Sequence, residues 1–480
     1  KWYHLYCSVQ RCNSALRVLN AATDEQVNGR VSRIAEMKVL RAHYYFELSR
    51  LFNKIPYFDE NVEISQYPDI PNNEFTRDEI LSMLAKEMLD AAEQLPASQP
   101  EVGRIHKYIA LAYAAKIKLY QAYQQDEITH AVTSINKELL REVVSLCDQV
   151  TASNRYGLLD DFQGLDLVAN ENGKESVFAI QYSMNDGTES AGRINWSNLL
   201  NSPGGGSPYG GDGFFLPSQD LINAYQTDAN GLPDFNYQSK SDYSWAVLNN
   251  GVYTLQNTTP NVDPRLDFVV GRPTITWKTY PDKPCEGWVR DKETYGYNCA
   301  KRFWVSPESS DMFNGWPWGA SQLNWQIIRY ADILLWKAEA LIELNEGNGL
   351  ETARDLINQI RNRARNSAYV KDFNDHSKYA ANYLVNPYPA DVWNQDYARQ
   401  ALRWETRLEK ALEGERFFDL VRWGIVETTM NKYITAESDN RIYYANAHFT
   451  GGKDEYYPVP NNQYGFSGGK YVQNPGYAPF

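Results

Sequence analysis

Residues 413–424 read EGERFFDLVRWG, and charged side chains are threaded among aromatic and aliphatic ones along the whole segment. A surface helix keeps its polar and apolar residues on opposite faces, and this segment does not. At helical spacing Glu413 can reach Arg416, and Asp419 can reach Arg416 or Arg422. We therefore predict a helix buried on nearly all sides, whose charges are tolerated because each has a partner.

The segments that precede this one are typical of packed helices. RYADILLWKAEALIELN (329–345) runs to a Gly-Asn-Gly stop, and ETARDLINQIRNRAR (351–365) follows after only a few residues. The small side chains of Ala331 and Ala338 permit close approach between the two helices. Such pairs resemble tetratricopeptide units, although no clean repeat of about 34 residues can be read.

Apolar periodicity is equally strong in the first half of the chain. In KVLRAHYYFELSRLF (38–52) and RIHKYIALAYAAKIKLYQAY (104–123), apolar residues recur at the spacing of one buried helical stripe. Another helix should begin at Thr76, because Glu79 completes a capping box, and should end at Pro96. We predict a mainly α fold with a stacked-helix scaffold and a few short strands.

The overall composition excludes several classes of protein. The 480 residues carry a net charge of −13, a pI near 5.1 and 43% hydrophobic residues, as in a globular protein with a sizeable core. This charge, without a basic run or zinc-finger spacing, argues against nucleic-acid binding. No apolar stretch reaches the roughly 20 residues needed to cross a bilayer. The chain opens with KWYHLYC, already in helical register, so we expect that further residues precede it in the natural protein.

The middle of the chain differs from the helical blocks on either side. NSPGGGSPYGGDGFFLPS (201–218) is rich in glycine, and DMFNGWPWGASQLNW (311–325) is rich in tryptophan. Long irregular segments in compact proteins are usually functional, since binding residues tend to lie on loops held by a rigid base. We predict a helical scaffold at 1–183, a loop-rich ligand-binding region at 184–325, C-terminal helix pairs at 326–430 and an irregular segment at 431–480 that packs on the scaffold.

Aromatic residues reach 14% of the chain, with 34 tyrosines and 13 tryptophans, and many lie in this middle region. An aromatic face packs against the C–H face of a sugar ring or against a peptide side chain, while polar neighbours fix the orientation. For each ring a purely structural role, pinning its own loop to the helices, is the alternative. The case for binding is strongest for Trp316 and Trp318, because a Trp-Pro-Trp turn between glycines tends to project its rings.

No catalytic, cofactor or metal motif stands out. The histidines form no metal-binding pattern, no nucleophile elbow is present, and the glycine loop at 203–213 lacks the residues of a phosphate or dinucleotide site. A carboxylate pair at glycosidase spacing stays open, but nothing singles one out. Asp160, Asp161 and Asp166 could hold Ca²⁺, although a solvated turn is the favoured interpretation. We predict no enzyme activity, no cofactor and no bound metal.

The five cysteines form no zinc motif. Cys285 and Cys299 flank a loop that contains glycine and tyrosine, and they could pair in an oxidising compartment. Free buried thiols are an equally good interpretation, and the sequence leaves both open.

Seven stretches spread over nearly the whole chain occur in the order of one known family. They are KWYHLYCSVQRCNSAL (1–16), LRAHYYFELSRLFNKIPYFDE (40–60), ESVFAIQYS (175–183), DPRLDFVVG (263–271), RYADILLWKAEALIELN (329–345) with LINQIRNRAR (356–365), RLEKALEGERFFDLVRWG (407–424) and YYPVPNNQ (456–463). Together they resemble the SusD/RagB family, the surface lipoproteins of Bacteroidetes nutrient-uptake systems.

The resemblance implies a helical scaffold with tetratricopeptide-like pairs and a loop-rich ligand site. It implies a non-enzymatic protein on the extracellular face of the outer membrane, anchored by a lipid on an N-terminal segment absent here. Such a protein captures oligosaccharides and delivers them to a SusC-like TonB-dependent transporter. Oligopeptide capture, as in the RagB branch, is the alternative, and a glycoside hydrolase is a weaker one.

Ligand residues in this family follow no motif, so the expected site rests on loop position and on local context. Family pockets draw aromatic residues from loops near 275–300 and just before residue 329. The expected ligand-binding residues are Trp288, Tyr295, Trp316, Trp318, Tyr209 and Trp277.

Overall fold

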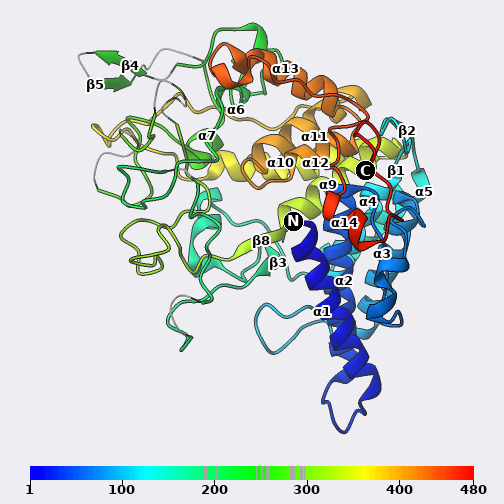
Figure 1. Cartoon of the computed structure of the whole chain (residues 1–480). Helices are drawn as coiled ribbons and strands as arrows, with labels where there is room; N and C mark the ends of the chain where they lie inside the picture. The colour runs from blue at the N-terminus through cyan, green and yellow to red at the C-terminus, as the bar shows by residue number, and fades with distance from the viewer. Residues whose placement is uncertain are drawn as a thin grey trace.

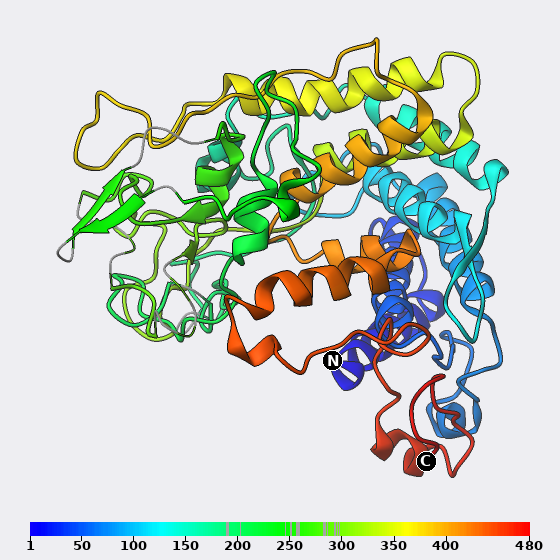
Figure 2. The ribbon, with the colours of Figure 1, turned by 90° about the horizontal axis from the view of Figure 1, so that it is seen from above.

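The chain folds into a stack of helices with a loop-rich region on one side, and both views show this division (Figures 1 and 2). The mainly α fold class is confirmed. The computed structural model describes all residues except 189–191, 202, 245, 250–251, 256–259, 282–284, 286, 292–293, 295 and 297.

Five helices form the N-terminal half of the stack, each packed against the next. They are α1 (Trp2–Ala21), α2 (Arg30–Phe52), α3 (Arg77–Gln94), α4 (Lys107–Ala122) and α5 (Lys137–Thr151). The predicted capping box at the start of α3 is present: the Glu79 carboxylate accepts from the Thr76 amide at 2.8 Å, and the Thr76 hydroxyl accepts from the Glu79 amide at 3.3 Å.

The stack continues without interruption into the second half of the chain. Helix α5 packs against α9 (Tyr330–Leu344), and α9 packs against both α10 (Gly349–Asn366) and α11 (Gln395–Glu409). Helices α9 and α10 form the predicted pair with a short turn. The two helical blocks that lie far apart in the sequence therefore build one scaffold.

The loop-rich region leaves this scaffold and returns to it at a single place. Strand β3 (Ser176–Ile180) pairs antiparallel with β8 (Trp325–Arg329), so the two ends of the excursion lie side by side. Its regular elements are short, as predicted. They are α6 (Gln219–Ala224), β4 (Ala246–Asn249), β5 (Val252–Leu255), α7 (Arg265–Val269), β6 (Val270–Gly271) and β7 (Cys299–Ala300).

The C-terminal segment packs back on the N-terminal helices. The Tyr457 amide donates to the Leu51 carbonyl of α2 at 2.8 Å, and the Asn474 side chain donates to the Phe52 carbonyl at 2.7 Å. The remaining elements are β1 (Tyr123–Gln125), β2 (Val132–Ile135), α12 (Arg416–Arg422), α13 (Val426–Ser438), α14 (Asn461–Phe466) and the 3-10 helices η1 (Ile64–Asp69), η2 (Phe162–Asp166), η3 (Val168–Asn170), η4 (Tyr237–Ser239) and η5 (Ile442–Tyr444). Among the described residues, no helix combines the length and apolar character needed to cross a membrane.

In the segment 413–424, residues 419–423 are buried, 413 and 415–418 are half-buried, and Gly414 and Gly424 are exposed. One of its predicted ion pairs is wrong. Glu413 binds Arg329 at 2.8 Å and Lys410 at 2.5 Å, and not Arg416. Helical spacing does not apply between Glu413 and Arg416, because α11 ends at Glu409 and α12 begins only at Arg416. Gly414 turns the chain between the two helices with φ of +83°, a left-handed conformation that favours glycine.

The second predicted pair is present. Asp419 accepts from Arg422 at 2.9 Å, and the Arg422 guanidinium also pairs with Glu339 of α9. The Trp423 indole N–H donates to the same Glu339 carboxylate at 2.9 Å. This segment thus joins α12 to the middle of the stack through buried charges, as its mixed composition predicts.

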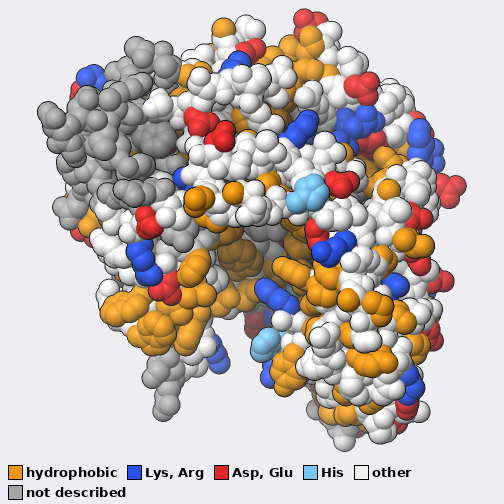
Figure 3. All heavy atoms as spheres, turned by 45° about the horizontal axis from the view of Figure 1, so that its top comes forward, with side chains coloured by type: hydrophobic (Ala, Val, Ile, Leu, Met, Phe, Trp, Pro, Cys, Tyr) orange, Lys and Arg blue, Asp and Glu red, His pale blue; other side chains and the backbone are white. Residues whose placement is uncertain are grey.

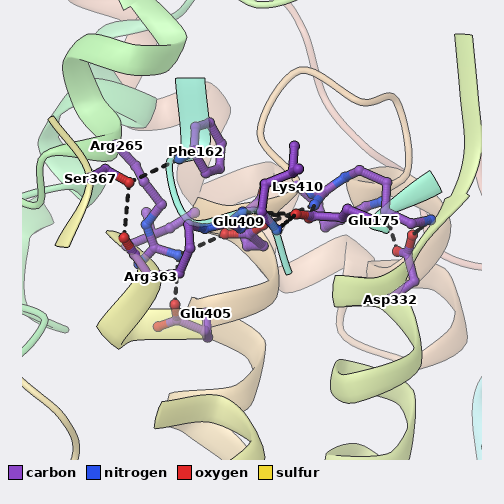
Figure 4. Close-up of polar contacts among 12 residues, drawn as sticks. Phe162, Glu175, Arg265, Asp332, Arg363, Ser367, Glu405, Glu409 and Lys410 are labelled. Carbon is purple, nitrogen blue, oxygen red and sulfur yellow. Dashed lines mark hydrogen bonds and ion pairs between the residues drawn. The ribbon is translucent and has the colours of Figure 1, made fainter. Parts of the chain in front are cut away.

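A larger network of buried charges surrounds Glu409 at the end of α11 (Figure 4). Its carboxylate binds Arg329 at 3.0 Å, Arg265 at 3.2 Å and also Arg363. Glu175, next to β3, binds Arg329 at 2.7 Å and Arg363 at 3.1 Å. Burial alone would raise the pKa of Glu409, but the three arginines lower it to about 2. All these side chains are almost fully buried, so each charge depends on its partners.

The same network reaches into the loop-rich region. Arg302 pairs with Asp166 of η2 and binds Glu413 at 3.1 Å. Asp166 also binds Lys278 at 3.0 Å and accepts from the Phe303 amide at 3.1 Å. Charged side chains therefore tie the loops around residues 278 and 302 to the ends of α11 and β8.

We predict that Glu409→Gln lowers the free energy of unfolding by about 3–5 kcal/mol, since it leaves buried arginines without their counter-charge. The folded-state pKa of Glu409 lies below the unfolded value of about 4.3, so the unfolded chain binds more protons between these values. This stabilisation is present above pH about 4.5 and is lost as the pH falls towards 2. Urea unfolding at several pH values measures both effects.

The control is Glu346→Gln, which removes an exposed pair with Arg141 whose N–O distance is 2.7 Å. Water screens this pair, so the substitution should leave stability nearly unchanged. If both variants lowered the free energy of unfolding equally, the buried network would not contribute more to stability than an exposed ion pair.

Candidate functional site

Trp316 and Trp318 project from a short loop whose base is closed by hydrogen bonds. The two side chains are 63% and 52% exposed, as expected of the turn. The Phe313 amide donates to the Ala320 carbonyl at 2.8 Å, and the Gln322 amide donates to the Asp311 carbonyl at 3.1 Å. The loop therefore holds both indole rings in solvent on a fixed base.

The glycine-rich loop lies directly against this turn. A Cβ atom built at Gly210, where φ is +69°, would lie 2.9 Å from the Cβ of Trp318, so only glycine fits there without a shift. A third segment joins them through the Asn195 amide, which donates to the Ser321 carbonyl at 2.8 Å. The Phe214 amide in turn donates to the Leu200 carbonyl at 2.9 Å.

These three segments together expose a set of large apolar side chains, which we call the aromatic surface. Figure 3 shows hydrophobic side chains gathered at the lower left, on the loop-rich side, and also over the helices on the right. An exposed apolar area of this kind is typical of a binding site. Phe215 has a φ of +56°, a strained conformation for a bulky residue that is commonly kept at functional positions. The aromatic surface consists of Trp196, Leu200, Phe214, Phe215, Trp316 and Trp318.

Three of the expected ligand-binding residues lie in the interior instead. Tyr209, Trp277 and Trp288 are 1%, 0% and 3% exposed and belong to one buried cluster with Trp304. The Trp277 indole donates to the Tyr209 hydroxyl at 2.8 Å, and that hydroxyl donates to the Val305 carbonyl at 2.7 Å. The three rings pack against one another in tilted and edge-to-face contacts. This burial favours the loop-pinning alternative for them.

The expected site residues therefore lie in different environments. Trp316 and Trp318 lie together on the surface, whereas Tyr295 lies outside the described residues. Trp196, Phe214 and Phe215 were part of the aromatic middle but were not among the expected site residues. Their position beside the glycine-rich loop was the signal that could have favoured them.

A cavity of about 960 Å³ with polar and apolar walls opens between η2, η3 and the loops at 278–279 and 305–311. Three of its carboxylates have partners: Asp160 binds Lys174 at 2.9 Å, Asp161 accepts from the Gln163 amide at 2.8 Å, and Asp166 binds Lys278 at 3.0 Å. In the part of the chain that the structure describes, no group of His, Cys, Asp or Glu residues is arranged to hold a metal ion. The three aspartates thus serve as acceptors for neighbouring groups of the chain.

Two groups near the cavity have pKa values shifted towards neutrality. Burial lowers the pKa of Lys301 to about 7, while its ammonium donates to the Asp267 carbonyl at 2.8 Å. Burial raises the pKa of Glu171 to about 7, although its carboxylate accepts from the Asn324 amide at 2.5 Å. Glu171 lies beside Asp311 and Asn324 at the base of the Trp316–Trp318 loop, so the charge there depends on pH near 7.

The sequence matches two family models along most of its length. Residues 174–477 match the SusD family, and residues 1–119 match a family described as starch-binding associating with outer membrane. The chain belongs to the SusD family, as the seven stretches predicted.

The curated relatives that the chain matches are SusD-like proteins. A SusD-like protein of Bacteroides ovatus is 22% identical over 443 residues, which cover 88% of this chain and 65% of that protein. SusD-like protein P2 of Formosa agariphila is 24% identical over 428 residues, which cover 88% of this chain and 70% of that protein. The chain thus spans 65–70% of the length of these relatives.

Solved structures share the fold. A SusD homolog from Bacteroides thetaiotaomicron superposes with a TM-score of 0.70 at 18% identity, covering 99% of this chain and 85% of that one. A laminarin-binding SusD-like protein gives 0.63 at 21% identity, with coverage of 99% and 85%. Surface glycan-binding protein A from Bacteroides thetaiotaomicron, in complex with laminarihexaose, gives 0.61 at 19% identity, with coverage of 98% and 84%.

We predict that Gly210→Ala displaces the Trp318 ring, because the new Cβ would lie 2.9 Å from the Trp318 Cβ. Hydroxyl-radical labelling followed by mass spectrometry should report a changed labelling rate at Trp318. Gly29→Ala is the matched control, since Gly29 has the same φ of +69° and its Cβ would meet nothing within 4 Å. Both substitutions carry a backbone cost of about 1–2 kcal/mol. An unchanged labelling rate in the Gly210 variant would show that the two loops are not in contact.

Proposed function

We propose that the chain is the substrate-binding subunit of a nutrient-uptake system on the bacterial surface. It captures oligosaccharides and delivers them to a SusC-like TonB-dependent transporter in the outer membrane. The observation that carries the proposal is the exposure of Trp316 and Trp318 on a loop with a hydrogen-bonded base. Membership of the SusD family and its fold similarity to glycan-binding proteins support it.

The chemistry of the aromatic surface suits a neutral, hydroxylated ligand. Each indole offers a flat apolar face on which the C–H face of a sugar ring packs, and neighbouring amides and hydroxyls supply hydrogen bonds. The residues that form the surface are themselves uncharged, and the nearby Asp212 and Arg290 lie 3.5 Å apart as a pair. A glucan of the laminarin type, as bound by two structurally similar proteins, is the first ligand to test.

The proposed role is binding and not hydrolysis. Deep burial of the acidic residues around Glu409, with arginines as partners, fits structural support. The proposed site of action is the extracellular face of the outer membrane, with a lipid anchor on the N-terminal side. A low affinity is compatible with this role, because tethering near a transporter raises the effective ligand concentration.

Calorimetric titration with laminarihexaose and a panel of other oligosaccharides tests the proposal. Trp316→Ala and Trp318→Ala should each weaken binding about ten-fold or more, since each removes one stacking face. The control is Phe466→Ala, which removes a 50% exposed aromatic side chain from α14 and should leave affinity unchanged.

Wild-type protein that binds no glycan of the panel would overturn the proposal. Peptides found by mass spectrometry in the purified protein, and displaced by the same two tryptophan substitutions, would instead establish oligopeptide capture at this surface. Turnover of any bound oligosaccharide on long incubation would contradict the non-enzymatic role.

A further inference from the structure

Cys285 and Cys299 both lie against Gly271 of β6. Cys299 in β7 pairs with Gly271 in β6, and a Cβ built at Gly271 would lie 3.1 Å from the Cys285 sulfur. The Cys299 thiol is close enough to raise the pKa of the Cys285 thiol. Both residues are buried, at 2% and 0% exposure, and both are thiols in this structure. The geometry therefore brings two thiols together from positions 285 and 299.

We propose that Cys285 and Cys299 form a disulfide when the chain folds outside the cytoplasm, and that this bond restrains the loop supporting the aromatic surface. The oxidant is a disulfide, either a small molecule such as oxidised glutathione or a disulfide oxidoreductase. One cysteine thiolate attacks that disulfide, forms a mixed disulfide and releases one thiol. The second cysteine attacks the mixed disulfide and releases the second thiol, so the two protons of the protein thiols leave on the two released thiols.

Burial determines when this reaction happens. Burial, followed by the neighbouring Cys299 thiol, raises the pKa of Cys285 well above its ordinary value. The thiolate is the reactive species, so the folded, reduced protein exchanges slowly with external disulfides. The bond therefore forms during folding, before the pair is covered. Once formed, the same burial shields it from external reductants.

A short series of contacts connects this pair to the aromatic surface. The Trp288 amide donates to the Cys285 carbonyl at 3.1 Å, and the Trp288 carbonyl accepts from the Gly204 amide at 3.1 Å. Gly204 belongs to the glycine-rich loop, in which Gly210 lies against Trp318. A bond at Cys285 restrains Trp288, whose amide donates to the Cys285 carbonyl, and through Trp288 the loop on which Trp318 rests.

The test compares wild-type protein refolded with oxidised glutathione and with a reducing agent. Oxidative refolding should lower the intact mass by that of two hydrogen atoms and should yield a cross-linked peptide containing Cys285 and Cys299. In the oxidised form, hydrogen exchange at the Gly204 amide should be slower by about ten-fold. Cys285→Ser should abolish the cross-link, whereas Cys147→Ser, at a fully buried cysteine in α5, should leave it intact.

Alkylation of both Cys285 and Cys299 after oxidative refolding would overturn the proposal. Unchanged exchange at Gly204 despite a formed disulfide would overturn the supporting role of the bond. A gain in glycan affinity on oxidation rests on the function proposed above, whereas the mass and exchange measurements need no ligand. A protein that forms the bond but binds no glycan would therefore refute that function and leave this inference standing.

Discussion

The buried charge network between the helical stack and the loop-rich region is the constraint on which the rest of the structure depends. A charge removed from water is tolerated only when its partners are in place, and loss of one partner costs several kcal/mol. Arg329 binds Glu175 beside β3. It also binds Glu409, the last residue of α11, and Glu413, which follows that helix. A shift of the loops would leave such charges unpaired. The loops are thus held in one position although they contain little regular structure.

This anchoring explains how tryptophan can both fill the interior beneath the loops and project into solvent from them. Trp277, Trp288 and Trp304 fill the space beneath the loops, where Tyr209 satisfies an indole N–H. Trp316 belongs to a loop that leaves its ring in solvent. The buried rings give the loops a firm base, so little conformational entropy remains to be lost when a ligand packs on the exposed ones.

The helices could be predicted from the sequence because their signals are local. The capping box at Thr76 and the apolar stripe of α4 depend on residues within a few positions of one another. The two arginine partners of Glu413 could not be predicted in this way, since Arg329 lies 84 positions away and Arg302 lies 111 positions away. The exposure of each tryptophan likewise depends on which distant loop covers it. The resemblance to the family predicted the fold and the order of its segments along the chain. It did not predict which side chains face solvent.

Native-state hydrogen exchange in increasing denaturant tests most directly whether the network unites scaffold and loops. The amides of Lys301 and Phe303, which donate to Val269 and Asp166, report on the loop-rich region, and amides within α4 report on the stack. We predict that both sets exchange through the same global unfolding, with the same free energy and denaturant dependence. Exchange of Lys301 and Phe303 at a much lower free energy, while α4 stays protected, would contradict it.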